Sequence, residues 1–424
     1  MKKFSRSAFA ALLSVAALPA FAQPDPVKPA QTLTAEEKQE ILDDVSTVIL
    51  KFAYVPGIDF SKWPEILAAQ KDRIDKATDA FSFANAVNQA LNRFSASHIV
   101  LNTPEAATAM VRQEFVGLGI QPMPSNDGIL INYVFPRSAA DEVGLEIGDI
   151  IMEADGKALK TTEALRGTEG SKVTIKVKKR NGTIQTHTVT RKKFSTRRPE
   201  TLTWVNPNVA KLEIPSFMSY SYETVGKLMG EAQRAKALIV DLRGNGGGQV
   251  IALLHLCGYF VPTDTVMGAW VTKDLVNTYT KETNGSGTDL SGMLKYALDK
   301  NSRALVRPNA VGKTQYKGEV IVLIDGGTGS ASEMFAAAMK ENRSAQVIGS
   351  KSAGAVLASR LYPIKHEFMI QYPFQDYITV KGLRLEGNGV EPTIKSAGRA
   401  RLTESDPGVS AALLFLRNTK VITD

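Results

Sequence analysis

The spacing of hydrophobic and polar residues changes along the chain and marks a helical region near its beginning. Between residues 33 and 108, apolar residues recur at helical intervals, as in "EILDDVSTVILKF" and "FANAVNQALNRF". Thr34 and Glu37 precede the first of these runs at the spacing of a capping box, which predicts where its helix begins. We therefore expect residues 33–108 to form a helical N-terminal region.

Two further segments follow with different periods. Residues 109–193 contain short alternating runs such as "DGILINYVF" and "KVTIKVKK", separated by Gly, Pro and Asn turn signals, which predict a small β-rich module. In residues 194–424, apolar strands such as "ALIVDLRG" and "EVIVLIDGG" alternate with helical runs such as "ASEMFAAAMKEN". This alternation is typical of an α/β domain with a mostly parallel central sheet and flanking helices.

Residues 262–316 form an insertion within that α/β segment. They include the tract "TKETNGSGTDLSG", which is polar and contains several glycines. Such a composition predicts a mobile surface loop, and we expect it to lie near the functional site.

The first 22 residues have the pattern of a secretory signal peptide. Lys2, Lys3 and Arg6 precede an apolar run that closes on "AFA", a small-x-small cleavage site, and a Pro-rich stub at residues 23–32 follows. An uncleaved membrane anchor is the alternative, but the apolar stretch is short for a bilayer span. We therefore expect the mature chain to be periplasmic or secreted.

Composition and charge exclude several classes of function. The net charge of +8 falls to +5 when the signal peptide is lost, and the only dense basic block is "RKKFSTRR", so nucleic acid is not an expected partner. Cys257 is the only cysteine and lies in an apolar run, which predicts a buried thiol and no intramolecular disulfide. With four histidines and no HExxH or CxxC pattern, we expect neither a metal site nor a cofactor.

Ser330 is the first candidate for chemistry. It follows a predicted strand, lies in the glycine-rich stretch "GGTGSAS" and begins a predicted helix. The oriented N–H groups at a helix N-terminus favour negative charge, which suits both a nucleophile and a developing oxyanion. The local residues also fit a second interpretation, in which Ser330 or Ser332 is only the N-cap of that helix. A nucleophilic serine further needs a base to remove its proton.

The β-rich module resembles a PDZ domain through "GLGI" and "PRSAADEVGLEIGDIIMEADGKAL". The resemblance implies that Gly117, Leu118, Gly119 and Ile120 form the loop whose N–H groups hold the C-terminal carboxylate of an added peptide. A packing or regulatory module is the other interpretation. The segment "TTEALRG", where the groove-lining helix belongs, is about one turn short, which predicts a shallow groove.

Four ordered blocks in the α/β segment resemble the C-terminal processing (tail-specific) serine proteases and their tricorn-type relatives. They are "DLRGNGGG", "GGTGSASEMFAAAM", "VIGSKSAGA" and "LEGNGVEP". The resemblance implies a ClpP/crotonase-like α/β protease core next to the PDZ domain and the helical region. It also assigns the nucleophile to Ser330.

The general base of the processing proteases is a lysine in a "GEKTFGKG"-like turn, and this chain lacks it. The matching position is Ala355, and Lys351 of the same turn matches a variable position of the pattern. The tricorn-type branch instead has a Ser-His pair upstream, which corresponds here to Ser97 and His98 in "NRFSASHIVLN". The resemblance therefore implies His98 as the base and Ser97 as an auxiliary hydroxyl.

The same branch completes its site with a glutamate, which corresponds to Glu386 in "LEGNGVEP". Glu386 is expected to orient the His98 imidazole, although an ion pair with a neighbour is an alternative role. We expect the oxyanion to be held by the N–H of Ala331 and by a glycine N–H of "GNGGG", with Gly247 the first choice and Gly246 the second.

The other histidines and the "DLRGN" charges are expected to be structural. His187 falls in the β-rich module, His255 in an apolar helix and His366 in a late strand, and none of them matches a motif. Asp241 and Arg243 are expected to hold their loop rather than to take part in chemistry.

Three hypotheses of function fit these observations. The favoured hypothesis is a serine endopeptidase that cleaves extended polypeptides, with a preference influenced by the substrate C-terminus. The alternative is an inactive relative that binds peptides or acts as a scaffold, for which the missing lysine is the best argument. Binding of an apolar ligand is a third hypothesis, since interphotoreceptor retinoid-binding proteins reuse this core fold. The sequence leaves the natural substrate and the oligomeric state open.

Overall fold

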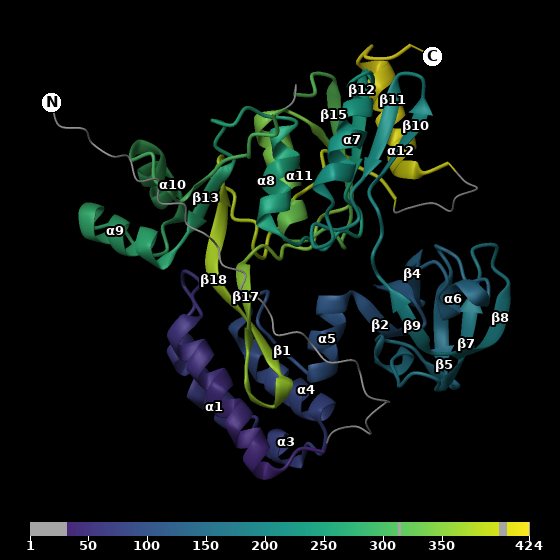
Figure 1. The fold of residues 1–424 in the computed structure, drawn as a ribbon, viewed down its shortest axis with the longest axis vertical. Helices are drawn as coiled ribbons and strands as arrows, with labels where there is room; N and C mark the ends of the chain where they lie inside the picture. The colour runs from purple at the N-terminus through teal and green to yellow at the C-terminus, as the bar shows by residue number, and fades with distance from the viewer. Residues whose placement is uncertain (1–31, 313–314, 398–404, 424) are drawn as a thin grey trace.

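The structure is a computed structural model that describes residues 32–312, 315–397 and 405–423. The predicted signal peptide and nearly all of the Pro-rich stub lie outside these residues. Figure 1 shows an α/β core at the top, helices of the N-terminal region below it, and a β-rich domain to one side. The predicted fold class is confirmed.

The N-terminal region is helical, as its periodicity predicts. Helix α1 (Ala35–Phe52) begins at Thr34, whose side chain accepts a hydrogen bond from Glu37 N–H while the Glu37 carboxylate accepts one from Thr34 N–H, so the predicted capping box is confirmed. The elements that follow are η1 (Phe60–Lys62), α2 (Trp63–Ala68), α3 (Lys71–Lys76), α4 (Ala80–Leu91), η2 (Asn92–Phe94), β1 (Val100–Asn102) and α5 (Pro104–Arg112).

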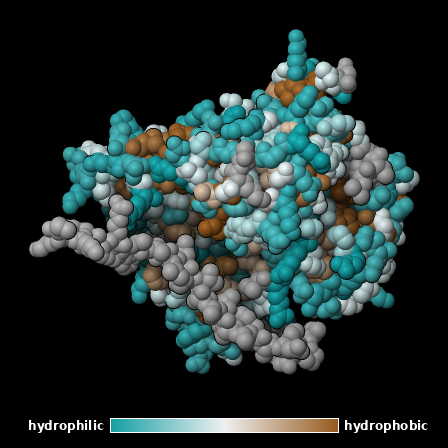
Figure 2. Space-filling model, turned by 45° about the horizontal axis from the view of Figure 1, so that its top comes forward, coloured by the Kyte–Doolittle hydropathy of each residue, from teal (hydrophilic) through white to brown (hydrophobic). Residues whose placement is uncertain are grey.

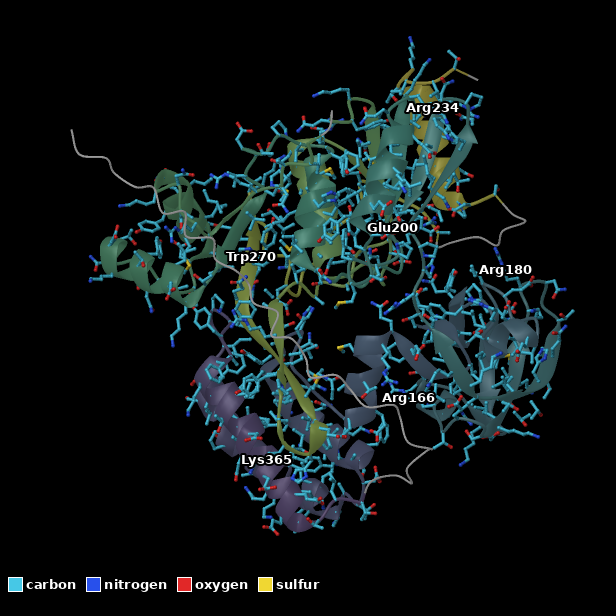
Figure 3. All side chains as sticks on the ribbon, in the orientation of Figure 1. Arg166, Arg180, Glu200, Arg234, Trp270 and Lys365 are labelled. Atoms are coloured by element: carbon cyan, nitrogen blue, oxygen red, sulfur yellow. The ribbon has the colours of Figure 1, made fainter. Side chains whose placement is uncertain are left out.

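One long strand, β18 (Met369–Thr379), ties this helical region to the core. Its beginning pairs with β1 and β17 (Ala358–Pro363), and its end pairs with β13 (Gly268–Val271), all antiparallel. At the tip of the β17–β18 hairpin, η4 (Lys365–Glu367) lies against α1, and Lys365 Nζ is 2.7 Å from Glu40 (Figure 3). Strand β18 therefore fixes β1, the segment that directly follows His98 and Ile99.

The β-rich domain is an antiparallel sheet in the order β3-β4-β5-β7-β8, with β6 beside β5 and a separate β2–β9 pair. In place of the groove-lining helix there is only a short 3-10 turn, η3 (Glu163–Leu165), in agreement with the shortened sequence. Its other elements are β2 (Glu114–Gly117), β3 (Ile120–Ser125), β4 (Gly128–Val134), α6 (Ala139–Glu142), β5 (Ile150–Ala154), β6 (Lys157–Ala158), β7 (Lys172–Lys178), β8 (Ile184–Thr190) and β9 (Lys192–Ser195).

The core is a six-stranded sheet in the order β10-β11-β12-β15-β16-β19, parallel except for β10 at its edge. All five residues of β12 are buried, because helices cover both faces. The strands are β10 (Thr201–Asn206), β11 (Val209–Glu213), β12 (Ala237–Asp241), β15 (Glu319–Ile324), β16 (Gln346–Gly349) and β19 (Ile394–Lys395).

Alternate residues of each core strand face opposite helical layers. Leu238 and Val240 pack with the helices α7 (Tyr222–Ala232), α8 (Val250–Gly258) and α11 (Ala331–Asn342). Ile239 and its neighbours pack with α12 (Pro407–Asn418) on the other face. Because β11, β12, β15 and β16 are parallel, the loops that follow them lie together at the carboxyl edge of the sheet.

The insertion differs from the loop that its composition predicts. Residues 262–316 contain β13, α9 (Lys273–Thr283), α10 (Leu290–Asp299) and β14 (Leu305–Val306), with a small apolar core of their own. The polar tract covers the end of α9, a short link and the start of α10. The prediction of a loop was wrong because Asn284 in the left-handed conformation ends one helix and the Asp289 side chain caps the next.

One face of the molecule can be followed in Figure 2 and is mainly polar. On the face shown in Figure 2, hydrophilic residues cover most of the area and hydrophobic residues gather in small separate patches. None of the helices in the described ranges has the length and hydropathy of a membrane span.

Candidate active site

Ser330 stands at the start of α11 with a strained backbone. Its φ of 53° and ψ of −121° are rarely adopted by a residue with a side chain, and such conformations concentrate at functional sites. Its N–H donates to the Ala355 carbonyl at 2.9 Å and to the Glu333 carboxylate at 3.0 Å. Ser330 is the N-cap residue, as the second interpretation proposed, whereas Ser332 lies inside the helix. Two acceptors therefore fix the unusual backbone of Ser330.

Glu333 is a structural carboxylate that the sequence interpretation missed. It is fully buried and accepts hydrogen bonds from Ser330 N, Ala355 N, Gly354 N and Ser352 Oγ at 2.6 to 3.0 Å. Burial raises the pKa of Glu333 above its ordinary value, and these hydrogen bonds act in the opposite direction. The only signal in the sequence was its capping-box spacing from Ser330.

His98, Ser97 and Glu386 come together although 288 residues separate His98 from Glu386 in the chain. Ser97 Oγ is 2.7 Å from His98 Nδ1 and donates to Glu386 Oε2 at 2.9 Å. Ser97 N–H donates to Glu386 Oε1 at 2.8 Å, and Val356 N–H donates to Oε2 at 2.8 Å. Glu386 is buried, and its neighbour Arg384 pairs with Asp376 instead.

These hydrogen bonds fix the tautomer of His98. The single hydroxyl proton of Ser97 goes to the carboxylate of Glu386, which can only accept when ionised, so the Nδ1 of His98 donates to Ser97 Oγ. The neutral ring then carries its lone pair on Nε2. Burial lowers the pKa of His98, while the charge of Glu386 raises it; the net shift is downward. His98 is thus suited to accept a proton near neutral pH.

Ser330 and His98 are linked through a shared turn rather than by a hydrogen bond of their own. Among the described residues, no hydrogen bond joins the Ser330 hydroxyl to the His98 ring. The link between them runs through the turn after β16: Ser330 N–H bonds Ala355, and the next residue, Val356, bonds the Glu386 carboxylate that also holds Ser97. Resting sites often show such open geometry.

The turn that holds the lysine in the processing proteases passes beside Ser330 here. Ala355, at the matching position, contacts Ser330 through its carbonyl. Lys351 is half exposed, and its Nζ pairs with Glu391 Oε1 at 2.9 Å. An exposed, ion-paired ammonium is a poor base, so this geometry does not favour Lys351.

The candidate oxyanion donors lie around Ser330. A Cβ on Gly247, whose φ is +100°, would stand 2.6 Å from Ser330 Cβ, so only glycine allows this approach. Gly247 N–H, however, donates to the Asn245 side chain at 2.9 Å. In the described part of the chain, the N–H groups of Ala331 and Gly246 have no hydrogen-bond partner.

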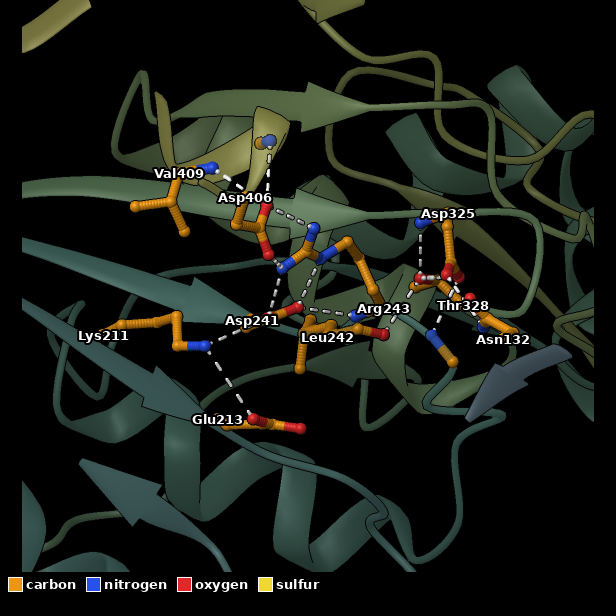
Figure 4. Close-up of polar contacts among 12 residues, drawn as sticks. Asn132, Lys211, Glu213, Asp241, Leu242, Arg243, Asp325, Thr328, Asp406 and Val409 are labelled. Atoms are coloured by element: carbon orange, nitrogen blue, oxygen red, sulfur yellow. Dashed lines mark hydrogen bonds and ion pairs between the residues drawn. The ribbon is translucent and has the colours of Figure 1, made fainter. Parts of the chain in front are cut away.

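A polar network holds the "DLRGN" loop against the loop before Ser330 (Figure 4). Asp325 accepts from Gly244 N–H at 2.8 Å, and Thr328 Oγ1 donates to the Leu242 carbonyl at 3.0 Å. Arg243 is buried between carboxylates, which agrees with the structural role predicted for it. The two loops that carry the candidate donors and the serine are therefore one connected unit.

The PDZ-like loop lies close to this network. Leu118 is buried in the domain core, and a Cβ on Gly119, with φ +80°, would stand 2.0 Å from Ser138 Cβ. Among the described residues, the N–H groups of Leu118 and Gly119 have no hydrogen-bond partner. Gln121, on the strand that Ile120 begins, donates through Nε2 to the Gly244 carbonyl at 2.9 Å. The loop from Gly117 to Ile120 therefore ends at the residue directly before the contact of Gln121 with the core.

The remaining histidines each have a side-chain partner elsewhere in the fold. His187 is near Gln185, His255 bonds Tyr220, and His366 bonds Glu40. The described ranges contain no group of three or more His, Cys, Asp and Glu side chains placed to hold a metal ion.

The fold and this site define a class of protein: an α/β core of the serine-peptidase type with a PDZ domain before it. Residues 208–396 match the family model described as peptidase family S41, and residues 116–190 match that of the PDZ domain. The α/β core of the chain is thus similar to peptidase family S41.

The chain is also similar to named proteases in sequence. The chain is 24% identical over 307 residues to a probable CtpA-like serine protease of Staphylococcus haemolyticus, covering 68% of this chain and 54% of that protein. It is 27% identical over 369 residues to the tail-specific protease of Haemophilus influenzae, covering 78% and 49%. The chain thus spans about half the length of the curated relatives it matches.

Among solved structures, mature CPAF is similar in fold, with a TM-score of 0.58, 14% identity and coverage of 91% of this chain and 97% of that chain. The photosystem II D1 C-terminal processing protease gives a TM-score of 0.55, 18% identity and coverage of 86% and 93%.

Proposed function

We propose that this protein is a serine endopeptidase that cleaves extended polypeptides with Ser330 as nucleophile, His98 as general base and Glu386 as the group that orients the imidazole. The observation that carries the proposal is the hydrogen-bonded series from His98 Nδ1 through Ser97 Oγ to Glu386. This series leaves Nε2 as the basic atom of the ring, and it attaches to the turn that bonds Ser330.

The reaction follows the acyl-transfer scheme of serine peptidases. Ser330 Oγ attacks the scissile carbonyl, and His98 Nε2 takes the hydroxyl proton and then returns it to the leaving amine. Water attacks the acyl-enzyme in the second half, again with His98 as base. Substrate binding must bring the ring and the hydroxyl into hydrogen-bond contact, because the resting site does not join them.

The developing oxyanion is held by backbone N–H groups near Ser330. Ala331 N–H, at the start of α11, is one donor, and Gly246 N–H is available as the other. Gly247 serves as a donor once its N–H turns away from Asn245. Loss of one such donor costs about 3 kcal/mol of transition-state stabilisation.

The free N–H groups of the PDZ loop support recognition of a substrate C-terminus. In this proposal, the chain end of the substrate extends along β3, with its carboxylate at the N–H groups of Leu118 and Gly119. The short η3 turn leaves little groove for side chains, so we propose that binding depends mainly on the main chain and the carboxylate. The signal-peptide pattern of the first 22 residues supports a periplasmic or secreted location.

An inactive, peptide-binding relative is the second candidate function. The missing hydrogen bond between Ser330 and His98 and the engaged N–H of Gly247 both favour it. In that case the PDZ loop, rather than Ser330, is the functional site.

Reaction with a fluorophosphonate probe and cleavage of casein separate the two functions. The proposed peptidase labels at Ser330 and cleaves casein; both are lost in Ser330→Ala and fall by about 10⁴-fold or more in His98→Ala. Lys351→Ala is the matched control and keeps both. Absence of labelling and cleavage in the wild type between about pH 6 and 9 favours the binding function, because a neutral His98 is present in that range.

A further inference from the structure

A buried ion pair joins the last helix of the core to the loop that carries the candidate oxyanion glycines. Arg243 is 2% exposed, and its guanidinium contacts two carboxylates (Figure 4). Nε and Nη2 donate to Asp241 at 2.9 and 2.7 Å, and Nη1 and Nη2 donate to Asp406 at 2.9 and 2.7 Å. Asp241 is the last residue of β12, two residues before Arg243, whereas Asp406 lies 163 residues after Arg243.

The carboxylate of Asp406 both pairs with Arg243 and caps the N-terminus of α12. As the N-cap of α12, its Oδ1 accepts hydrogen bonds from Gly408 N–H at 2.9 Å and Val409 N–H at 3.2 Å. A Cβ on Gly408 would stand 3.2 Å from Arg243 Nη1, so glycine leaves room for the guanidinium at the helix start. The helix N-terminus and the arginine therefore bind the same anion from two sides.

Helix α12 is a firm support for this carboxylate. Its Ala412 and Leu416 are fully buried against Ile239 and Ile321 of the central sheet. The helix lies on the face opposite to α8 and α11, so Asp406 reaches the loop from the side away from Ser330.

From Arg243 the loop runs directly to the candidate site. Gly244 is held by Asp325 and Gln121, and Asn245 Nδ2 donates to the Ile214 carbonyl at 2.8 Å. Gly247, two residues after Asn245, lies against Ser330. A displacement of Arg243 therefore moves the backbone that holds Gly246 and Gly247 in place.

We propose that Asp406 is a positioning residue that holds the oxyanion loop in its productive geometry through Arg243, which makes α12 a part of the catalytic support. The proposal rests on the proposed peptidase function. Without Asp406, Arg243 keeps its pair with Asp241, so no isolated charge remains buried and the fold persists. The loop loses only the contact of Arg243 with Asp406 at the start of α12.

Asp406→Ser tests the proposal, because serine keeps the N-cap of α12 and removes the contact with the guanidinium. With casein-derived peptides, we expect kcat to fall at least about tenfold with little change in KM, since oxyanion donors act in the transition state. Asp406→Glu, which retains the charge, regains part of that loss. The matched control is Asp289→Ser, which changes another aspartate N-cap, on α10, and leaves kcat unchanged.

Amide hydrogen exchange provides a readout that does not need turnover. Exchange over residues 242–248 should be faster in Asp406→Ser than in the wild type and unchanged in Asp289→Ser. If the wild type cleaves and Asp406→Ser matches its kcat, the positioning role is overturned. Unchanged exchange in Asp406→Ser overturns it even when the wild type is inactive. If the wild type is inactive but exchange is faster in Asp406→Ser than in the wild type, Asp406 does hold the loop, and only the peptidase proposal is refuted.

Discussion

At the scale of single residues, the catalytic hypothesis depends on the protonation state of one imidazole. His98 Nδ1 is committed to Ser97, which is committed to Glu386, so only Nε2 is free to take a proton. A ring whose pKa is lowered, so that it is neutral at physiological pH, is the form that a general base requires. Under this hypothesis, the pKa of His98 sets the pH dependence of activity.

The acid limb of the pH profile follows from that pKa. Burial lowers the pKa of His98 below about 6.5, so the ring loses its basic form, and the protein its activity, as the pH falls through a value below 6.5. The midpoint of kcat/KM against pH should lie below 6.5 and move lower in Glu386→Gln, which removes the charge that raises this pKa. Glu391→Gln, at the exposed partner of Lys351, should leave the midpoint in place. A midpoint above pH 7 contradicts His98 as the base.

Ala355 offers a second test of the base at the residue scale. Because its backbone contacts Ser330, a lysine there can reach the nucleophile. We expect His98→Ala/Ala355→Lys to label faster with fluorophosphonate than His98→Ala alone, with a rate that rises towards alkaline pH as the amine loses its proton. The control Ala353→Lys, at an exposed position of the same turn, should give no recovery. Equal rates in both lysine variants would refute the assignment of position 355.

At the scale of elements, the start of α11 and the turn after β16 are held between two buried carboxylates. Glu333 binds Gly354 and Ala355, and Glu386 binds Val356. The same carboxylates reach Ser330 on one side and Ser97 on the other. The turn therefore sets the spacing between the serine and the histidine.

Glu333→Gln should weaken this arrangement. In glutamine, an NH₂ group replaces one of the two carboxylate oxygens. Where it replaces the oxygen that accepts from Ser330 N–H and Ala355 N–H, donors face donors. Each buried N–H group that loses its acceptor costs about 1–3 kcal/mol of stability. We expect a lower free energy of unfolding in urea and slower probe labelling. Glu223→Gln, at an exposed helical position, should change neither quantity. A stable and fully reactive Glu333→Gln would show that the carboxylate does not position Ser330.

At the scale of the whole molecule, the PDZ domain contacts the core where the candidate oxyanion loop begins. Gln121 bonds the Gly244 carbonyl, and Arg198 lies over the Tyr133 ring, 3.8 Å from its centroid, while it pairs with Glu213 of the core. Figure 1 shows the domain beside the core, and the linker to β10 carries Arg198. A change in the position of the PDZ domain would therefore act on the candidate oxyanion loop through Gly244.

Gln121→Ala should reduce activity without unfolding the PDZ domain. The lost hydrogen bond to Gly244 is worth about 0.5–1.5 kcal/mol, which corresponds to a two- to tenfold lower kcat if the loop geometry in the transition state depends on it. Steady-state cleavage of a peptide substrate measures this change. Gln185→Ala, on the far strand β8 of the same domain, is the matched control. A wild-type kcat in Gln121→Ala would mean that the domain contact does not support the loop.

The sequence by itself determined the local structure and the candidate chemistry. The capping box at Thr34, the apolar run of β12 and the glycine-bracketed Ser330 are short-range signals, because capping, periodicity and turn chemistry depend on neighbours in the chain. The same kind of signal misled at residues 262–316, where polar composition concealed two capped helices.

The tertiary structure alone decided which residues meet. Only folding brings Ser97 to Glu386 and Arg243 to Asp406, and no local pattern shows that Glu333 binds the turn beside Ser330 or that Ser330 and His98 rest without a direct hydrogen bond. The physical reason is that burial and hydrogen bonding between distant segments depend on how the strands and helices pack, whereas the sequence pattern records only what each segment does on its own.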